Sequence, residues 1–269
     1  AAQSRRLLLR DLEIGLDEQQ FTLHYQPIVQ LRTQRIVKAE ALLRWQHPQR
    51  GLVGPGEFIE LTEESGLIVP LGDWVLREAA NQLTQWRSTL DADFRLSVNV
   101  SPIQLHSGAH QVAPWLEHLR SLQLPGEALT IEITERVLLE PDPLSDGKLH
   151  ALQEAGMQLA LDDFGTGYSS LSYLKRFDID YIKIDRSFVS HLSRDSQDLV
   201  LCQAIIAMAH QLGIHVVAEG VETQEQHDIL LAAGCDYGQG YWYCRPIAAA
   251  ALSERLRQQQ EGALALPTP

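Results

Sequence analysis

The sequence predicts an α/β fold, a TIM-type (β/α)8 barrel, from two observations. Short apolar runs alternate with amphipathic stretches along the 269 residues, as strands alternate with helices in a parallel barrel. Polar residues close or directly follow these runs, namely Glu40, Asn99, Glu132, Asp162, Asp163, Lys183, Glu219 and Gln239. Such a barrel takes about 250 residues, and no Ser-, Gly- or Pro-rich linker divides the chain, so we expect one large domain.

The apolar runs give the expected strands. They cover residues 36–43, 94–100, 129–134, 157–161, 181–184 and 214–218. The longest interval between runs, from 43 to 94, is expected to hold extra helices. Two helix starts are marked by their caps, because Ser101 precedes a proline and Thr223 begins a capping box with Gln226.

Both ends of the chain carry helical patterns. Leucines at 8, 12 and 16 with charges between them predict a lead-in helix, and residues 248–260 predict a last helix. We therefore expect a lead-in helix at 1–20, a barrel at 21–260 and a frayed tail at 261–269. The lead-in helix is compatible with a chain that is part of a longer protein.

Neither a membrane span nor a disulfide framework is expected. No apolar run approaches the roughly 18 residues of a span, and the apolar run after Arg5 and Arg6 is too short for a signal peptide. Cys202, Cys235 and Cys244 lack CxxC spacing and lie in apolar surroundings, which predicts buried, reduced thiols. The expected location is the cytoplasm, either as a separate protein or as the cytoplasmic part of a larger membrane-anchored one.

The net charge of the chain limits the classes of molecule that it is expected to bind. Lys plus Arg number 22 and Asp plus Glu number 35, for a net charge of −13. This argues against DNA or RNA as a partner and leaves carboxylates available to bind cations. An anionic substrate would then need a metal to mediate its approach.

The polar residues at the strand ends are expected to converge, because all βα loops of a parallel barrel lie on one face. Crowded carboxylates repel one another unless cations neutralise them or some stay protonated. The oxygen donors are Glu40, Asn99, Glu132, Asp162, Asp163 and Glu219. Such donors favour Mg²⁺ or Mn²⁺. The adjacent Asp162 and Asp163 suit two ions with one bridging ligand, a recurrent arrangement for phosphodiester hydrolysis.

The same residues also fit less specific roles. A single acid at a strand end is most often a helix cap or a solvated charge, and Lys183 has Asp185 as a near neighbour in sequence. Barrels of the enolase type also combine three carboxylates, Mg²⁺ and a lysine, but they remove a proton next to a carboxylate. The adjacent aspartates favour the phosphodiester hypothesis over that one. His106 and His110 have HxxxH spacing without the glutamate of a zinc protease motif.

From about Leu12 to Ile247 the sequence resembles the EAL-domain cyclic di-GMP phosphodiesterases of bacteria. The motifs that carry this resemblance are Tyr25-Gln26-Pro27-Ile28, Glu40-Ala41-Leu42-Leu43-Arg44, Asn99-Val100-Ser101, Glu132-Ile133-Thr134-Glu135, Asp162-Asp163-Phe164-Gly165-Thr166-Gly167, Lys183-Ile184-Asp185, Ala218-Glu219-Gly220-Val221-Glu222 and Gly238-Gln239-Gly240-Tyr241. One triplet would carry no weight, but eight in order at matching spacing are specific.

The resemblance implies a modified barrel whose first strand, about residues 21–29, runs antiparallel to the others. It assigns one metal to Glu40, Asn99, Glu132 and Asp162 and a second to Asp162, Asp163 and Glu219. It implies that Lys183 positions and helps activate the attacking water and that Gln239 bonds near the water or phosphate. Supporting roles fall to Glu222 beside the site, to Glu135 as the anchor of the loop after Asp163, and to Gln26 and Arg44 as substrate contacts.

The implied reaction opens one phosphodiester bond of cyclic di-GMP to give linear 5′-pGpG. Ca²⁺ is expected to inhibit, because its looser coordination disturbs the geometry that Mg²⁺ enforces. The resemblance also suggests a homodimer, with residues 169–175 coupling the interface to the metals, and an upstream GGDEF or sensory domain. The alternative is a catalytically silent cyclic di-GMP receptor, since some members of this family have lost catalysis.

Overall fold

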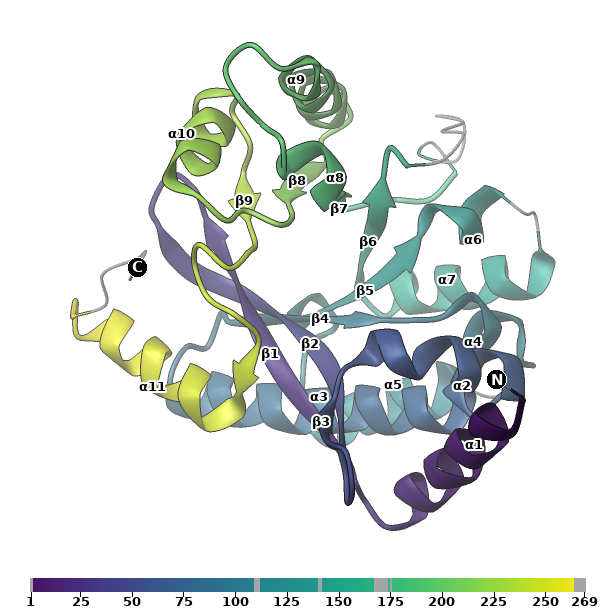
Figure 1. Ribbon diagram of the computed structural model, residues 1–269. Coiled ribbons are helices and arrows are strands. Elements are labelled where there is room, and N and C mark those ends of the chain that lie inside the picture. The colour runs from purple at the N-terminus through teal and green to yellow at the C-terminus, as the bar shows by residue number, and fades with distance from the viewer. Residues whose placement is uncertain (1, 109–111, 140–141, 167–173, 175, 264–269) are drawn as a thin grey trace.

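Eight strands close into a barrel in the computed structural model, which describes residues 2–108, 112–139, 142–166, 174 and 176–263. The ring runs in the order β1 (Phe21–Gln30), β2 (Arg35–His47), β4 (Arg95–Asn99), β5 (Leu129–Thr134), β6 (Gln158–Phe164), β7 (Tyr181–Ile184), β8 (His215–Ala218) and β9 (Tyr237–Gly238), and β9 pairs back with β1. Two short strands, β3 (Gly51–Val53) and β10 (Ile247–Ala248), extend the sheet beside β2 and β1. The predicted fold class is confirmed (Figure 1).

The first strand is the exception to the parallel order. β1 runs antiparallel to β2 and to β9, whereas the pairs from β2–β4 through β8–β9 are parallel. The barrel therefore closes through β1, where Val29 faces Gly238 and Gln30 faces Tyr237. The antiparallel first strand that the resemblance implied is confirmed.

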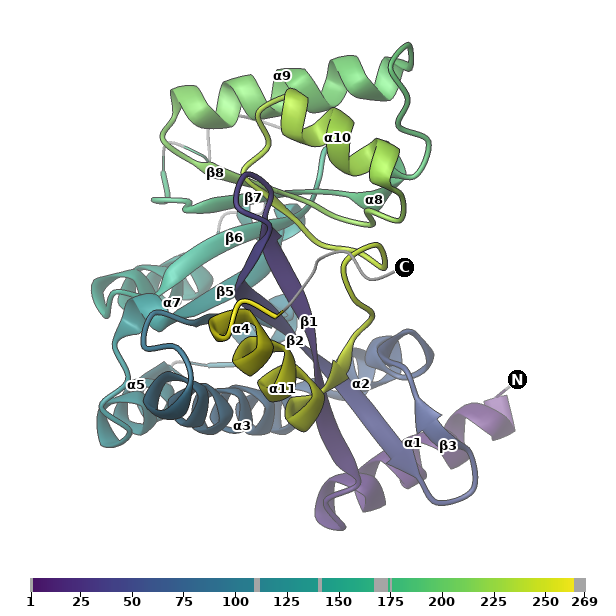
Figure 2. The ribbon, with the colours of Figure 1, turned by 90° about the vertical axis from the view of Figure 1, so that its left-hand side faces the viewer.

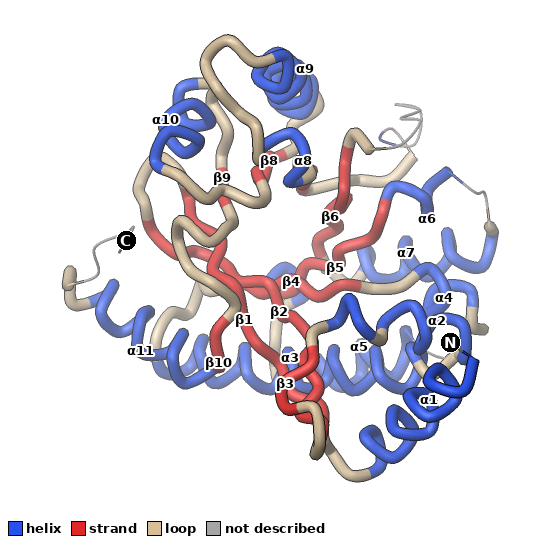
Figure 3. The backbone as a smooth tube through the Cα atoms, viewed as in Figure 1, coloured by secondary structure: helices blue, strands red, loops and turns tan. Residues whose placement is uncertain are grey.

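Helices lie outside the ring of strands (Figures 1 and 2), which Figure 3 marks in red. They are α1 (Ala2–Asp17), α2 (Ile59–Ser65), α3 (Ile68–Thr89), α4 (Pro102–His106), α5 (Val112–Ser121), α6 (Glu135–Leu139), α7 (Pro143–Glu154), α8 (Arg186–Val189), α9 (Gln197–Gln211), α10 (Gln224–Ala232) and α11 (Ala249–Gln260), with 3₁₀ turns at Pro55–Glu57 and Gly126–Ala128. The longest interval holds α2 and α3, as predicted. Ser101 and Thr223 form the expected caps, each with a full capping box.

The predicted strands agree with β5 and β7 residue for residue and differ elsewhere at the ends. The largest differences are in β2, which continues to His47, and in β6, which continues to Phe164. The predicted runs stop at Leu43 and at Leu161, before Arg44 and Asp162, but the backbone keeps pairing beyond them because neighbouring strands supply partners for the amide groups. The ends of β2 and β6 were therefore predicted too early, because their last residues include polar side chains.

Helix α1 packs onto the barrel. Leu12 is 1% exposed and belongs to the main apolar core. Gly15 lies so close to Trp45 that a Cβ added there would be 2.8 Å from the indole nitrogen. This side of α1 is thus buried, with Gly15 against Trp45 of β2 and Leu12 near Thr62 of α2 and Leu71 of α3.

Leu12→Ala is expected to lower the free energy of unfolding by about 2–5 kcal/mol, because it removes a fully buried side chain and leaves a cavity. The matched control is Leu7→Ala on the same helix, since Leu7 is 57% exposed. Urea denaturation followed by circular dichroism measures both. Equal, small losses in the two variants would mean that α1 is only an attached lead-in segment.

The structure tests two further expectations. Cys202, Cys235 and Cys244 are free and buried, as predicted. Within the described ranges, no helix combines the length and apolar character needed to cross a bilayer.

Candidate active site

The polar residues singled out in the sequence gather at the end of the barrel where the parallel strands finish. Asn99 ends β4, Lys183 lies in β7, and Glu219 and Gln239 directly follow β8 and β9. Their side chains come together because residues two apart on a strand share a face, and here that face is the barrel interior. Glu40 differs from the expectation, since it lies in the middle of β2 rather than at its end.

Lys183 is the centre of the cluster. Its Nζ lies 2.6 Å from Glu132 Oε2, 2.7 Å from Glu219 Oε1, 3.1 Å from Asp162 Oδ1 and 3.4 Å from Glu40 Oε2. The side chain is 1% exposed. Burial by itself would lower the pKa of Lys183, but the surrounding carboxylates outweigh it and raise the pKa well above its ordinary value. The ammonium group therefore stays charged.

Glu40 is held in place from two sides. Its Oε1 accepts a hydrogen bond from Asn99 Nδ2 at 2.6 Å, and its Oε2 accepts one from Gln239 Nε2 at 2.6 Å. Burial opposes ionisation, but Lys183 and these amide donors outweigh it and lower the Glu40 pKa. Gln239 Nε2 also lies 3.1 Å from Gln26 Oε1, and Gln26 Nε2 donates to the Cys244 carbonyl at 3.1 Å. Gln26 is thereby fixed beside the cluster.

One lysine does not neutralise so many acids. Burial first, and the Glu40 carboxylate second, raise the Glu132 pKa to about 7. Burial also raises the Glu219 pKa to about 8, with Lys183 acting in the opposite direction and Asp162 adding to the rise. The cluster thus meets the condition set out from the sequence, because its carboxylates are ionised together only when further positive charge is bound.

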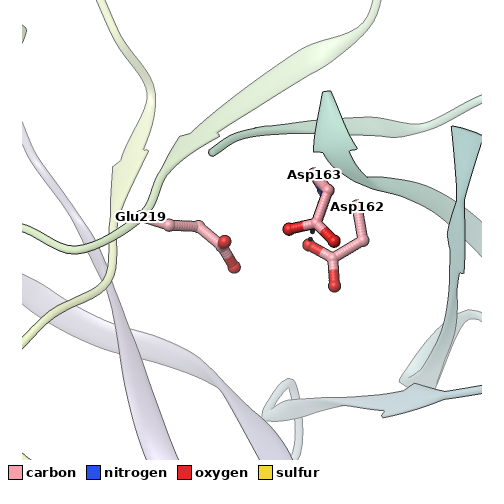
Figure 4. Close-up of side chains that lie close together, drawn as sticks. All are labelled: Asp162, Asp163 and Glu219. Carbon is pink, nitrogen blue, oxygen red and sulfur yellow. Dashed lines mark hydrogen bonds between the residues drawn. The ribbon is translucent and has the colours of Figure 1, made fainter. Parts of the chain in front are cut away.

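Asp162 and Asp163 reach the same side of the barrel through a β-bulge. The pairing of β6 with β7 shifts between Leu161 and Phe164, and Asp163 has φ 54°, in the left-handed region. In a regular strand these adjacent side chains would point to opposite faces. Instead, ligand oxygens of Asp162, Asp163 and Glu219 lie within 4.8 Å of one another, and the three carboxylates face a common space (Figure 4).

Two cavities open on either side of Glu40. One of about 410 Å³ reaches Asn99, Asp162 and Asp163 and extends between β2, α2 and α3, where apolar residues such as Ile59 and Val75 line it. The other, of about 210 Å³, is lined by residues that include Gln26, Glu219 and Gln239. Glu40, at the edge of the acidic cluster, therefore lines both cavities.

Two residues that line the smaller cavity were given no role from the sequence. Arg186 begins α8 and Tyr241 follows Gln239, and both line the smaller cavity. The Arg245 guanidinium lies 4.1 Å from the centre of the Tyr241 ring, which is 51% exposed. Arg186 and Tyr241 could have been found from the sequence because they lie just after β7 and β9, and the loops after the strands of a parallel barrel form the active face. Leu42, shared by both cavities, was quoted only as part of a motif.

The remaining predicted residues are Arg44, Glu222 and Glu135. Arg44 is half-buried on β2, and its Nη1 donates to the Leu43 carbonyl at 2.8 Å. Glu222 is exposed and lines the smaller cavity. Glu135 is 5% exposed and begins α6 directly after β5. Residues 167–173 and 175, most of the proposed coupling loop, lie outside the described residues, as does His110.

The raised pKa values predict a pH dependence of stability for the metal-free protein. Glu132 and Glu219 have folded-state pKa values of about 7 and about 8, above the roughly 4.4 of an exposed glutamate in the unfolded chain. Between these values the unfolded chain binds fewer protons, so the free energy of unfolding falls as pH rises from about 5 to 8. The expected result in EDTA is a smaller fall for Glu219→Gln than for the wild type, measured by urea denaturation at several pH values. A Glu225→Gln control on α10 should match the wild type, and an unchanged slope in Glu219→Gln would contradict the assignment.

Fold and site together define a barrel with a lysine-centred acidic cluster at the active face, the class that holds divalent cations with oxygen ligands. The family model for the EAL domain matches residues 9–246. The chain belongs to the EAL domain family.

Named relatives and a solved structure support this membership. The chain is 42% identical over 252 residues to MucR of Pseudomonas aeruginosa, a bifunctional diguanylate cyclase/cyclic di-GMP phosphodiesterase, covering 93% of this chain and 36% of MucR. It is 41% identical over 264 residues to the cyclic di-GMP phosphodiesterase NbdA of the same species, covering 94% of this chain and 34% of NbdA. The structure of the PaMucR phosphodiesterase in complex with cyclic di-GMP superimposes with a TM-score of 0.86 at 41% identity, covering 91% of this chain and 99% of that one. The chain spans about a third of the length of the curated relatives it matches.

Proposed function

We propose that this chain is a cyclic di-GMP phosphodiesterase that opens one phosphodiester bond of its substrate to give linear 5′-pGpG. The observation that carries the proposal is the convergence of Asp162, Asp163 and Glu219 beside Lys183. Relatives that bear this activity in their names are about 40% identical to the chain. The shape of the site also supports the proposal. A molecule with two nucleoside halves can place one nucleoside in each cavity while its phosphates lie over Glu40.

The donor set fits two divalent ions, Mg²⁺ or Mn²⁺. Six oxygen-bearing side chains converge, and the raised pKa values of Glu132 and Glu219 indicate that they need added positive charge to be ionised together. One ion would be held by Glu40, Asn99, Glu132 and Asp162, and the other by Asp162, Asp163 and Glu219. Two such ions lower the pKa of bound water and neutralise charge that develops on the phosphoryl oxygens. Ca²⁺ is expected to inhibit.

The chain's own residues orient the reaction. A water oxygen forms the new bond to phosphorus, the bond from phosphorus to the leaving ribose oxygen breaks, the water loses a proton and the leaving oxygen gains one. Lys183 is charged and central, so it orients the water and adds positive charge to the phosphoryl group as negative charge grows there. Gln239 has its amide nitrogen on Glu40 and its Oε1 buried without a partner among the described residues. That oxygen is positioned to accept a hydrogen bond from the attacking water.

Gln26, Arg44 and Glu222 complete the proposed site at its edge. The Gln26 amide is fixed between Gln239 and the Cys244 carbonyl, which suits a contact to substrate. Glu222 lines the smaller cavity, where its carboxylate would support the loop after β8. Arg44 is half-buried on β2, two residues beyond the cavity-lining Leu42, and its guanidinium group would bind phosphate or a guanine edge.

The experiment is hydrolysis of cyclic di-GMP by the purified chain with Mg²⁺ or Mn²⁺, with products resolved by chromatography. The comparisons are an EDTA control, Glu40→Ala and a matched surface variant, Glu13→Ala. Metal-dependent 5′-pGpG that disappears with EDTA and with Glu40→Ala, and persists with Glu13→Ala, is the expected result. Ligand bound without cleavage under every metal condition would identify a receptor, and neither binding nor cleavage would overturn the proposal.

Glu135→Ala is expected to reduce turnover about 10- to 100-fold while the fold is retained, as is typical when a group that supports metal ligands is removed. Glu135 is buried at the junction of β5 and α6, next to β6. Turnover and Mg²⁺ affinity should fall together, with Glu154→Ala on α7 as the control. Wild-type values for both quantities would remove Glu135 from the supporting residues.

We also propose that the chain acts as a homodimer and that its full-length protein carries an upstream GGDEF or sensory domain. MucR carries a second activity, diguanylate cyclase, in its name, and this chain covers only 36% of its length, which supports a further domain in the full-length protein. Light scattering on the purified chain tests the dimer, since a mass equal to that of one chain at all concentrations would contradict it.

A further inference from the structure

A third cavity, also lined by polar residues, lies at the opposite end of the barrel. It encloses about 220 Å³ and is lined by Lys38, Arg95, Tyr181 and Tyr237 together with apolar residues of β1 and β8. Arg95, Tyr181 and Tyr237 are the first residues of β4, β7 and β9. Because these strands run parallel, their starts face away from the active site.

The cavity is directly beneath the catalytic groups on the same strands. Lys38 precedes Glu40 by two positions on β2, and Tyr181 precedes Lys183 by two on β7. The same offset relates Thr130 to Glu132. Residues two apart share a face, so each of these strands presents one side chain to each site.

Lys38 is a buried basic group, and burial lowers its pKa to about 7, with the Glu132 carboxylate acting in the opposite direction. Lys38 is 5% exposed, its Nζ donates to Thr130 Oγ1 at 2.7 Å, and it lies 4.0 Å from the centre of the Tyr181 ring. Among the residues that the structure describes, it forms no ion pair within 4.0 Å. An ammonium group has three donors, and a buried charge is costly unless an anion or several hydrogen bonds compensate it.

Arg95 adds a second basic group with weak contacts. Its Nη1 lies 3.3 Å from the Tyr181 hydroxyl and 3.4 Å from Gln158 Oε1, both neutral groups. Two acids are near. Asp93 is exposed and lines the cavity, and Asp180 uses its carboxylate on the Leu159 amide at 2.8 Å. The Arg95 guanidinium therefore makes the inner part of the cavity positive in a chain whose net charge is −13.

The remaining walls are flat and apolar. The rings of Tyr181, His215 and Tyr237 contact one another at centroid distances of 5.8 to 6.0 Å. Ile28 and Val217 close the inner side. Two basic groups beside aromatic and aliphatic walls favour a small anion with a planar or apolar body.

We propose that this cavity binds a small organic anion, with its carboxylate or phosphate group against Lys38 and Arg95 and its body against Tyr237. The cavity is separate from the metal site and does not depend on the proposed phosphodiesterase activity. Its volume admits one small molecule and excludes a dinucleotide. The alternative is that the two basic groups only pack the base of the barrel.

The test is a methyl NMR titration of the full chain with isoleucine and valine methyl groups labelled with ¹³C, in EDTA. Inorganic phosphate and benzoate are the two probes, and they separate a phosphate from an aromatic carboxylate. The methyl groups of Ile28 and Val217 report on this cavity, whereas those of Ile59 and Val75 report on the active-site cavity. The expected result is saturable shifts at Ile28 and Val217, with a Kd on the order of 1 mM for at least one probe.

Arg95→Gln should weaken that binding at least tenfold, and Arg120→Gln, an exposed arginine on α5, should leave it unchanged. Lys38→Met is the second variant, and Arg95→Gln carries the test if Lys38→Met does not fold. Shifts confined to Ile59 and Val75, no shifts with either probe, or equal shifts in Arg95→Gln would each overturn the proposal.

Discussion

Replacing Lys183 by methionine is expected to reduce metal-dependent hydrolysis by about 10³-fold, the size of effect found when a charged group that acts on the transition state is removed. Methionine keeps the length of the side chain, so the barrel interior stays filled. What is lost is the ammonium group of Lys183, which lies within 3.4 Å of Glu40, Glu132, Asp162 and Glu219. Initial rates under saturating Mg²⁺ measure the effect.

The same variant should show a second change in the absence of metal. Breaking a buried ion pair by removing one partner costs about 3–5 kcal/mol, and here one lysine is shared by four carboxylates. The free energy of unfolding should therefore fall more in EDTA than in Mg²⁺, because bound ions replace the lost charge. Lys148→Met is the control, since Lys148 is also buried, at 5% exposed, but donates to the Gln104 carbonyl on the outer helices. A Lys183→Met enzyme with turnover within a few-fold of the control would exclude Lys183 from the reaction.

The members of the site could be predicted because one rule of strand geometry governs them. Inward-facing residues recur every two positions, and in a parallel barrel the last inward residue of each strand reaches the active face. Lys183 illustrates this, because it alternates with Ile182 and Ile184 in the sequence and is buried inside the barrel. The same rule would have shown the lower cavity, since Lys38 and Tyr181 are one inward position earlier.

The geometry of the aspartate pair could not be predicted from periodicity. Alternation places Asp162 and Asp163 on opposite faces, yet the bulge and the left-handed φ of Asp163 bring both to the active face. A bulge depends on the partner strand, which lies about 20 residues further along the chain. The local sequence therefore shows which residues are candidate ligands. The direction of their side chains depends on the pairing of β6 with β7.

The closure of the barrel by β1 also could not be predicted from local sequence, because it depends on a distant partner strand. β1 pairs antiparallel with β2 through a short turn, which local sequence can encode, but it also pairs with β9, at the far end of the chain. Only the resemblance to a known family supplied that orientation. The docking of α1 through Leu12 was likewise invisible, since an amphipathic pattern shows that a face is buried without showing what covers it.

Asp162→Asn is expected to lower turnover by at least 10²-fold, since a ligand assigned to both metals is weakened in each. The substitution is isosteric and keeps an oxygen that can accept from Lys183, now 3.1 Å from Asp162 Oδ1, so the fold should be preserved. Isothermal titration with Mn²⁺ should show both binding events weakened. Asp195→Asn, on an exposed loop, is the control.

Stability of the metal-free protein should move in the opposite direction. The Asp162 carboxylate contributes to the raised pKa values of Glu132, Asp163 and Glu219, so removing its charge relieves repulsion in the cluster. In EDTA at pH 8, Asp162→Asn should therefore unfold at higher urea than the wild type, while in excess Mn²⁺ the order should reverse. A site built for metal binding holds more negative charge than the folded chain alone tolerates. Full turnover in Asp162→Asn, or lower stability in EDTA, would mean that Asp162 is not the ligand shared by the two metals.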